Sequence, residues 1–149
     1  MVSLLTFTAP PNPCGYLPDR RASLEYEVVA EATAAEYLGR MKLGWRRFGH
    51  QFFRPACRTC SACRSLRVPV AAFHPDRSQR RAAAANAGTR LEIGGPAVTA
   101  EKLDLYDKFH AFQAGHKGWP DHGPKDAIDY AESFAENPFP TEEWCYYRG

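Results

Sequence analysis

The chain has 149 residues, of which 44% are apolar and 24% are charged, and its formal net charge is +2. This composition is typical of a soluble globular protein and excludes a disordered chain. No window approaches the run of about 20 apolar residues that a membrane-spanning helix needs, and the first residues lack the basic region of a secretory signal. The length allows one domain, or a small domain with part of a second.

The first half of the chain predicts strands around one short helix. Apolar and acidic residues alternate over 24–29, which is the period of a half-buried strand. Thr33 and Glu36 have the spacing of a capping box, which predicts a helix that ends at Gly44. The elements expected next are a turn over 44–49, a short strand over 51–53 and an edge strand over 66–70.

The second half predicts three helices and two strands. Ser78 is expected to cap a helix that ends near Asn86, and Thr99 to cap the longest helix, which runs to about Gly115. Pro124 is expected at the start of a third helix over 125–135. The remaining elements are a strand over 89–93 and a final strand over 143–147. Because we expect no second strand beyond the final one, the chain is expected to be cut within a domain.

The strongest chemical signal is a set of cysteines. Cys57, Cys60 and Cys63 follow one another at intervals of three, and Cys14 lies in a second loop rich in proline and glycine. Thiolates this close can converge on one cation, so we expect these four to bind zinc or an iron–sulfur cluster, with unligated thiols as the alternative. The spacing argues against disulfides and favours a reducing compartment, so a cytoplasmic protein is expected. Cys145, between aromatic residues, is expected to be an ordinary buried thiol.

Positive charge is concentrated over 40–81, where only Asp76 opposes eleven basic residues. Ten of these are arginine, whose planar fork matches phosphate. Aromatic residues interleave with them, and this combination is typical of a surface that binds nucleic acid, although a solvated charged face is the alternative. The basic residues are Arg40, Lys42, Arg46, Arg47, Arg54, Arg58, Arg64, Arg67, Arg77, Arg80 and Arg81.

No catalytic motif stands out. The sequence has no phosphate-binding glycine loop, no nucleophile elbow and no paired-carboxylate motif, so no nucleotide cofactor is expected and the catalytic residue stays unknown. His110, His116 and His122 have a spacing that fits no metal motif. His110 falls on the apolar side of a predicted helix, where a histidine in a core or pocket wall is the usual case.

Several stretches together resemble one family. The segments 14–18 (CGYLP), 44–49 (GWRRFG), 53–63 (FRPACRTCSAC) and 73–81 (FHPDRSQRR) occur in the order found in the aminoacyl-tRNA–protein transferases, followed by the Leu-Tyr-x-x-Phe pattern that ends at Phe109. The resemblance covers about residues 12–120. The cysteine segments resemble the bacterial branch, which transfers leucine. The branch that transfers arginine typically has a cysteine where this chain has Leu17.

This resemblance implies an α+β fold, with a small Cys-rich N-terminal α/β domain over 1–72. The first part of an acetyltransferase-like (GNAT-like) transfer domain over 73–149 would follow, because members of the family continue further. The implied partners are aminoacyl-tRNA and proteins of the N-degron pathway that begin with Asp or Glu; no membrane partner is expected. The α-amine of such a protein attacks the ester of the charged tRNA, so positioning and charge stabilisation can supply most of the rate.

Leucine is the favoured donor amino acid and arginine is possible. The tRNA phosphates are expected to bind Arg46, Arg47, Arg54, Arg80 and Arg81. Two other classes stay open: a non-catalytic metal- or cluster-binding module that binds tRNA or other RNA, and a redox or iron sensor.

Overall fold

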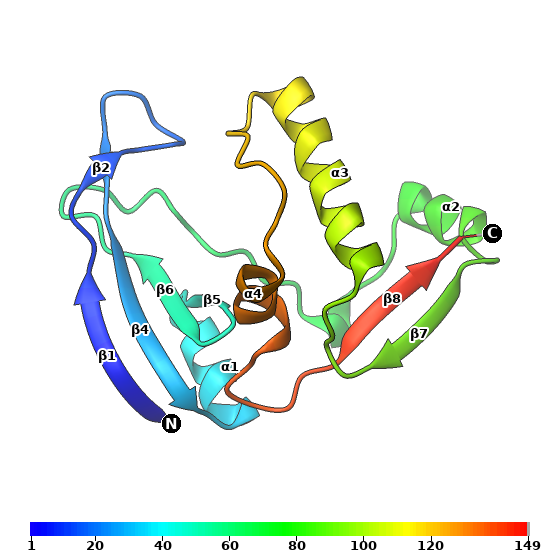
Figure 1. The fold of residues 1–149 in the computed structure, drawn as a ribbon, viewed down its shortest axis with the longest axis horizontal. Coiled ribbons are helices and arrows are strands. Elements are labelled where there is room, and N and C mark those ends of the chain that lie inside the picture. Colours follow the sequence, from blue (N-terminus) through cyan, green and yellow to red (C-terminus); the bar gives the residue numbers. More distant parts are fainter. Residues whose placement is uncertain (149) are drawn as a thin grey trace.

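The computed structural model describes residues 1–148 and forms three antiparallel sheets with helices between them (Figure 1). The first half contains β1 (Val2–Thr8), β2 (Asn12–Pro13), β3 (Arg21–Ala22), β4 (Leu24–Glu31), α1 (Ala34–Lys42), β5 (Arg46–Phe48), β6 (Gln51–Pro55) and a short 3-10 turn η1 (Val70–Ala72). The second half contains α2 (Arg77–Ala85), β7 (Arg90–Gly94), α3 (Ala100–Lys117), α4 (Ala127–Tyr130), a π-helical turn η2 (Ala131–Ala135) and β8 (Glu143–Tyr147).

The main sheet has four strands in the order β1-β4-β6-β5. It lies at one end of the molecule, and the two-stranded β7–β8 sheet lies at the other, with α3 and α4 between them (Figure 1). The combination of antiparallel sheets and separate helices confirms the expected mixed α+β class. The predicted boundary between residues 72 and 73 stays a prediction.

One face of the main sheet holds the apolar core. Val29 and Phe52 are fully buried, and Trp45, which follows α1, is 4% exposed. Tyr37 of α1 packs against this core, and Phe139 packs on Tyr37 with ring centroids 4.9 Å apart. The alternation of side chains along β4 produces this arrangement, because Val29 points to the covered face while its neighbours in sequence point away.

The predicted helix start at Thr33 is confirmed. The backbone N–H of Glu36 donates to the Thr33 hydroxyl over 3.3 Å, and the Thr33 N–H donates to the Glu36 carboxylate over 2.8 Å. The α-amino group of Met1 also donates to Glu36, and this bond, followed by those from Thr33, lowers the pKa of the carboxyl to about 2. The first residue of the chain is thereby tied to the first turn of α1.

Two predictions for the first half are wrong, and one strand was missed. Residues 66–70 form no strand and are exposed, because no neighbouring strand reaches them and Pro69 has no N–H to donate. The predicted turn over 44–49 contains β5, which pairs with β6. Strand β1, which pairs with β4, was not predicted: all seven of its residues are exposed, and its apolar–polar alternation is interrupted at Leu4 and Leu5.

Two helix starts and one helix end differ from prediction. Asp76 rather than Ser78 caps α2, since its carboxylate accepts from the N–H of Gln79 over 2.8 Å. Asp126 rather than Pro124 begins the helix over α4. Helix α3 starts after Thr99 as predicted but continues past Gly115 to Lys117, and Gly118, with a φ of 64°, ends it.

The final strand has a partner, which corrects the expectation that it stands alone. Strand β8 pairs with β7 from Arg90↔Tyr147 to Gly94↔Glu143. Lys102 of α3 forms an ion pair with Glu143, which raises the pKa of the lysine. This contact joins α3 to the two-stranded β7–β8 sheet.

The segment that leads from α4 to β8 returns to the main sheet. The N–H of Ala32 donates to the carbonyl oxygen of Pro138 over 2.9 Å, and Phe134 packs edge-on against Phe48 at 5.9 Å. Gly49, at the β5–β6 turn, lies directly against the carbonyl groups of Glu132 and Glu136. None of the helices within residues 1–148 combines the length and apolar character that crossing a membrane requires.

Candidate nucleic-acid interface

Two arginines flank a buried tryptophan on the covered face of the main sheet. The guanidinium carbons of Arg40 and Arg54 lie 5.0 Å and 4.9 Å from the Trp45 ring centroid. Each guanidinium also pairs with a carboxylate of β4, Arg40 with Glu27 and Arg54 with Glu25, both at 2.7 Å. A glutamate carboxylate of β4 therefore balances the charge of each arginine, and both arginines form cation–π contacts with the tryptophan.

Arg47 is also engaged within the protein. Its guanidinium carbon lies 5.3 Å from the Tyr37 ring and 4.8 Å from the Phe139 ring, and it donates to the side-chain oxygen of Asn137. These contacts bind β5 to the segment that follows η2. Arg47 therefore has a structural role, because it packs β5 against this segment.

The other predicted phosphate ligands are exposed. Arg46 lies on the opposite face of β5 from Arg47, and neither its side chain nor that of Arg81 forms an ion pair or hydrogen bond with another residue of 1–148. Arg80 donates to the carbonyl oxygen of Pro75 over 2.5 Å and is otherwise exposed on α2, which has no buried residue. Of the five arginines predicted to bind phosphate, Arg46, Arg80 and Arg81 are thus accessible.

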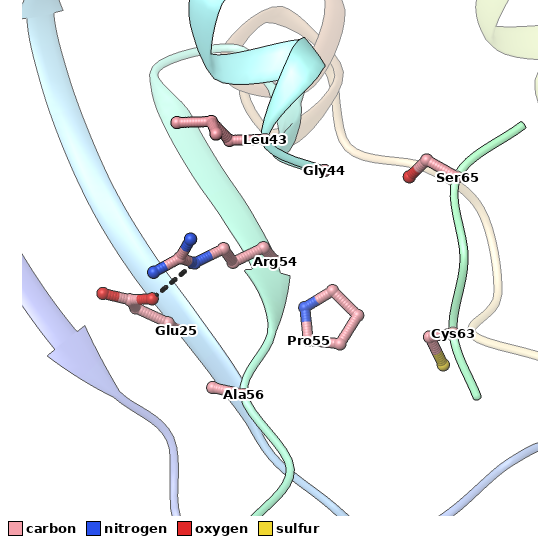
Figure 2. A pocket seen from close by; sticks show the side chains of 8 residues that line it. All are labelled: Glu25, Leu43, Gly44, Arg54, Pro55, Ala56, Cys63 and Ser65. Atoms are coloured by element: carbon pink, nitrogen blue, oxygen red, sulfur yellow. Dashed lines mark hydrogen bonds and ion pairs between the residues drawn. The ribbon is translucent and has the colours of Figure 1, made fainter. Parts of the chain in front are cut away.

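A shallow pocket separates the Arg54–Glu25 pair from the cysteine loop. Figure 2 shows the pair on one side, Pro55 in the middle of the view, and Cys63 and Ser65 on the returning loop. Leu43 and Gly44, from the end of α1, form another wall. Cys57 lines a different pocket, which it shares with Pro11 and Arg21 from the β2–β3 segment.

The four predicted metal ligands are accessible but not assembled. Cys14, Cys57 and Cys60 are half-buried and Cys63 is exposed, all as free thiols. The backbone N–H groups of Tyr16 and then Leu17 lower the pKa of Cys14, which favours the thiolate that a metal requires. Within residues 1–148, however, no three cysteine, histidine or carboxylate side chains are placed to hold one ion.

The four cysteines therefore have the chemistry of a thiolate metal site, but their side chains are not placed close enough together to form one. The four-cysteine site stays a prediction, and no step below depends on it.

The remaining candidates have ordinary surroundings. Cys145 is half-buried on β8 rather than fully buried. His110 is half-buried with its ring stacked on Tyr106 at 4.1 Å, so it packs on the apolar side of α3. His116 bonds to the carbonyl oxygen of Phe112 over 2.9 Å, and His122 is exposed.

One feature that the sequence analysis missed lies on the other face of the main sheet. Aromatic side chains from all four strands form a continuous row there: Phe7, Tyr26, Phe53 and Phe48. The alternation over 24–29 already placed Tyr26 opposite the acidic residues, but Phe7 could not be assigned while β1 was unrecognised. The register of the sheet was needed to align the rings.

Comparisons with known proteins identify the cysteine-bearing half. Residues 12–81 match the family described as Arginine-tRNA-protein transferase, N terminus. An aspartate/glutamate leucyltransferase of Campylobacter jejuni (strain 81-176) is 39% identical over 106 residues, which are 71% of this chain and 44% of the relative. The enzymes of the same name from Nitrosococcus oceani and Helicobacter hepaticus are 37% identical over 128 residues and 29% identical over 133 residues.

These last two alignments cover 85% and 89% of this chain, and 54% and 55% of the relatives. The chain thus spans about half the length of the curated relatives it matches. No solved structure matches the chain.

The matched segment contains β2, β3 and all strands of the main sheet except β1, together with the four cysteines predicted to bind metal, and it corresponds to the N-terminal part of the family described above. The chain belongs to the aminoacyl-tRNA–protein transferase family. Its resemblance to this family, predicted from the motifs, is confirmed.

Proposed function

We propose that this chain takes part in the transfer of an amino acid from aminoacyl-tRNA to the N-terminal α-amine of proteins that begin with Asp or Glu. Leucine is the favoured donor amino acid, because the relatives carry the name aspartate/glutamate leucyltransferase, and arginine is the second candidate. The similarity of 39% over 106 residues carries the proposal, and the family match over residues 12–81 includes the cysteine and arginine segments. The N-degron pathway and a cytoplasmic location belong to the same proposal.

The reaction needs little covalent chemistry from the protein. The amine attacks the ester carbonyl, an amide bond forms, and the tRNA 3′ oxygen leaves with a proton. An aminoacyl ester is already activated, so holding the two substrates in line and stabilising the developing charge can supply most of the acceleration.

The accessible arginines suit the phosphate backbone of the tRNA. Arg46 on β5 and Arg80 and Arg81 on α2 have exposed guanidinium groups and no acidic partner among residues 1–148. Arg47 and Arg54 are held by Asn137 and Glu25, so we assign them to packing and the other three to phosphate binding. We also propose that residues 73–148 belong to an acetyltransferase-like transfer domain.

Transfer and binding are tested on the same purified chain. Radiolabelled leucyl-tRNA and arginyl-tRNA are offered with peptides that differ only in an N-terminal Asp, Glu or Ala. We expect label to enter the Asp and Glu peptides only, and more from leucyl-tRNA. A chain that binds neither charged tRNA and labels no peptide would refute the proposal, whereas tRNA binding without transfer would favour the non-catalytic RNA-binding module.

A further inference from the structure

The aromatic row on the uncovered face of the main sheet has a defined register. Phe7 of β1 pairs with Tyr26 of β4, Tyr26 pairs with Phe53 of β6, and Phe53 pairs with Arg46 of β5. The rings of Phe7 and Tyr26 are stacked with centroids 5.1 Å apart, and those of Tyr26 and Phe53 are 6.1 Å apart. Three aromatic rings and one guanidinium thus cross the sheet in a single line.

Phe48 extends this row beside Arg46. It lies two residues along β5, on the same face, and its ring is stacked on that of Phe53 at 5.7 Å and 20°. Phe134 meets the Phe48 ring edge-on at 84°, which supports its orientation. Phe48 remains 55% exposed despite these two contacts, so a large part of an ordered ring faces solvent.

The strands segregate charge between the two faces. The carboxylates of Glu25 and Glu27 point to the covered face, where they pair with Arg54 and Arg40. On the uncovered face the row contains Arg46, whose guanidinium has no partner among residues 1–148. An aromatic surface with an uncompensated cation complements a ligand that offers both π-faces and negative charge.

We propose that Phe48, supported by Phe53, stacks on an unpaired base of single-stranded RNA and that Arg46 binds the adjoining phosphate. Every base has a π-face, so stacking on a protein ring tolerates any sequence, and arginine contributes both phosphate and cation–π contacts. This inference rests on the proposed function, because the amino acid of a charged tRNA is attached to its single-stranded 3′ end. The row would hold that end, while Arg80 and Arg81 bind phosphates elsewhere.

The test uses the full chain and a single-stranded oligoribonucleotide that ends in CCA, with a duplex RNA of the same length as competitor. Phe48→Leu keeps an apolar side chain but removes the aromatic face, and we expect it to weaken oligonucleotide binding about fivefold or more. Arg46→Gln should weaken binding and reduce the dependence of log affinity on log salt by about one. Phe112→Leu is the matched control, since Phe112 is also 55% exposed but lies on α3, and it should bind as the wild type does.

A second measurement does not depend on how well the variants fold. The same oligonucleotide with a thiouridine near its 3′ end is photocrosslinked to the wild-type chain, and the crosslinked peptide is mapped. We expect it to come from residues 46–53.

The proposal is overturned if the wild type does not bind the oligonucleotide, if Phe48→Leu and Phe112→Leu behave alike, or if the crosslinks map elsewhere. The last two outcomes would instead favour a protein segment as the partner that binds the uncovered face. These results are separate from the transfer assay, because a chain that labels peptides but fails this test keeps its proposed function and loses only the stacking site.

Discussion

Replacing Gly49 by alanine tests how closely the segment after α4 packs on the main sheet. Gly49 has a φ of 50°, in the left-handed region that side chains disfavour. An added Cβ would overlap the carbonyl oxygen of Glu132 and lie 3.1 Å from that of Glu136. Both partners are backbone atoms and cannot rotate away, so η2 would have to move off the β5–β6 turn.

Two other glycines separate the loss of stability into a backbone contribution and a steric contribution. Gly44 has a φ of 83° but nothing within 4 Å of an added Cβ, so Gly44→Ala carries the backbone penalty alone, roughly 1–2 kcal/mol. Gly88 has neither problem, and Gly88→Ala should be close to neutral. Gly49→Ala adds a steric overlap worth about 2 kcal/mol or more to the backbone penalty, so we expect a total loss of roughly 3–5 kcal/mol.

The free energy of unfolding is measured by urea titration followed by tryptophan fluorescence, to which the buried Trp45 and the more exposed Trp119 and Trp144 contribute. The expected order of stability is Gly88→Ala, then Gly44→Ala, then Gly49→Ala. A loss for Gly49→Ala within about 0.5 kcal/mol of that for Gly44→Ala would refute the close packing of η2 on the turn.

Three further predictions concern single side chains. Arg47→Ala should lower the urea midpoint, because its aromatic and Asn137 contacts are lost, while Arg46→Ala should leave the midpoint unchanged and weaken tRNA binding; the reverse pattern would contradict the assignment of the two faces of β5. The pKa of Glu36 in the fold is about 2, below its ordinary 4.5, so the charged form stabilises the fold above pH 4.5 and this contribution is lost as pH falls toward 2. Glu36→Gln should flatten that part of the acid-unfolding curve, and an unchanged curve would exclude the capping contact. Elemental and labile-sulfide analysis should find zinc or an iron–sulfur cluster that Cys57→Ser releases and Cys145→Ser retains, whereas a metal-free wild type would show the ligand prediction to be wrong.

Elements with a strong local signal were predicted well. The capping box at Thr33 and the cap at Thr99 depend on side chains and backbone groups only three residues apart, so sequence spacing alone reveals them. The strands over 24–29 and 89–93 pair with distant segments, but their apolar and polar patterns already marked them as strands.

The edge strands could not be predicted for the opposite reason. Strand β1 is exposed throughout and exists because β4 offers it hydrogen-bonding partners, while residues 66–70 have a strand-like composition but no neighbour. A strand is defined by pairing with a distant segment, and β-propensity describes only a fit to such a surface.

By itself, the sequence determined the family and the positions of two helix caps. It also revealed a basic segment rich in aromatic residues and four cysteines, three in that segment and Cys14 in an earlier loop. Only the tertiary structure decided which arginines are free: Arg46 and Arg47 are adjacent in sequence but lie on opposite faces of β5, one toward solvent and one toward Tyr37 and Phe139. Charge and composition are properties of each residue alone, whereas exposure depends on the register of the strands and on the segment that returns from α4 to cover one face. The difference between a packing arginine and a binding arginine therefore arises only when the sheet has formed.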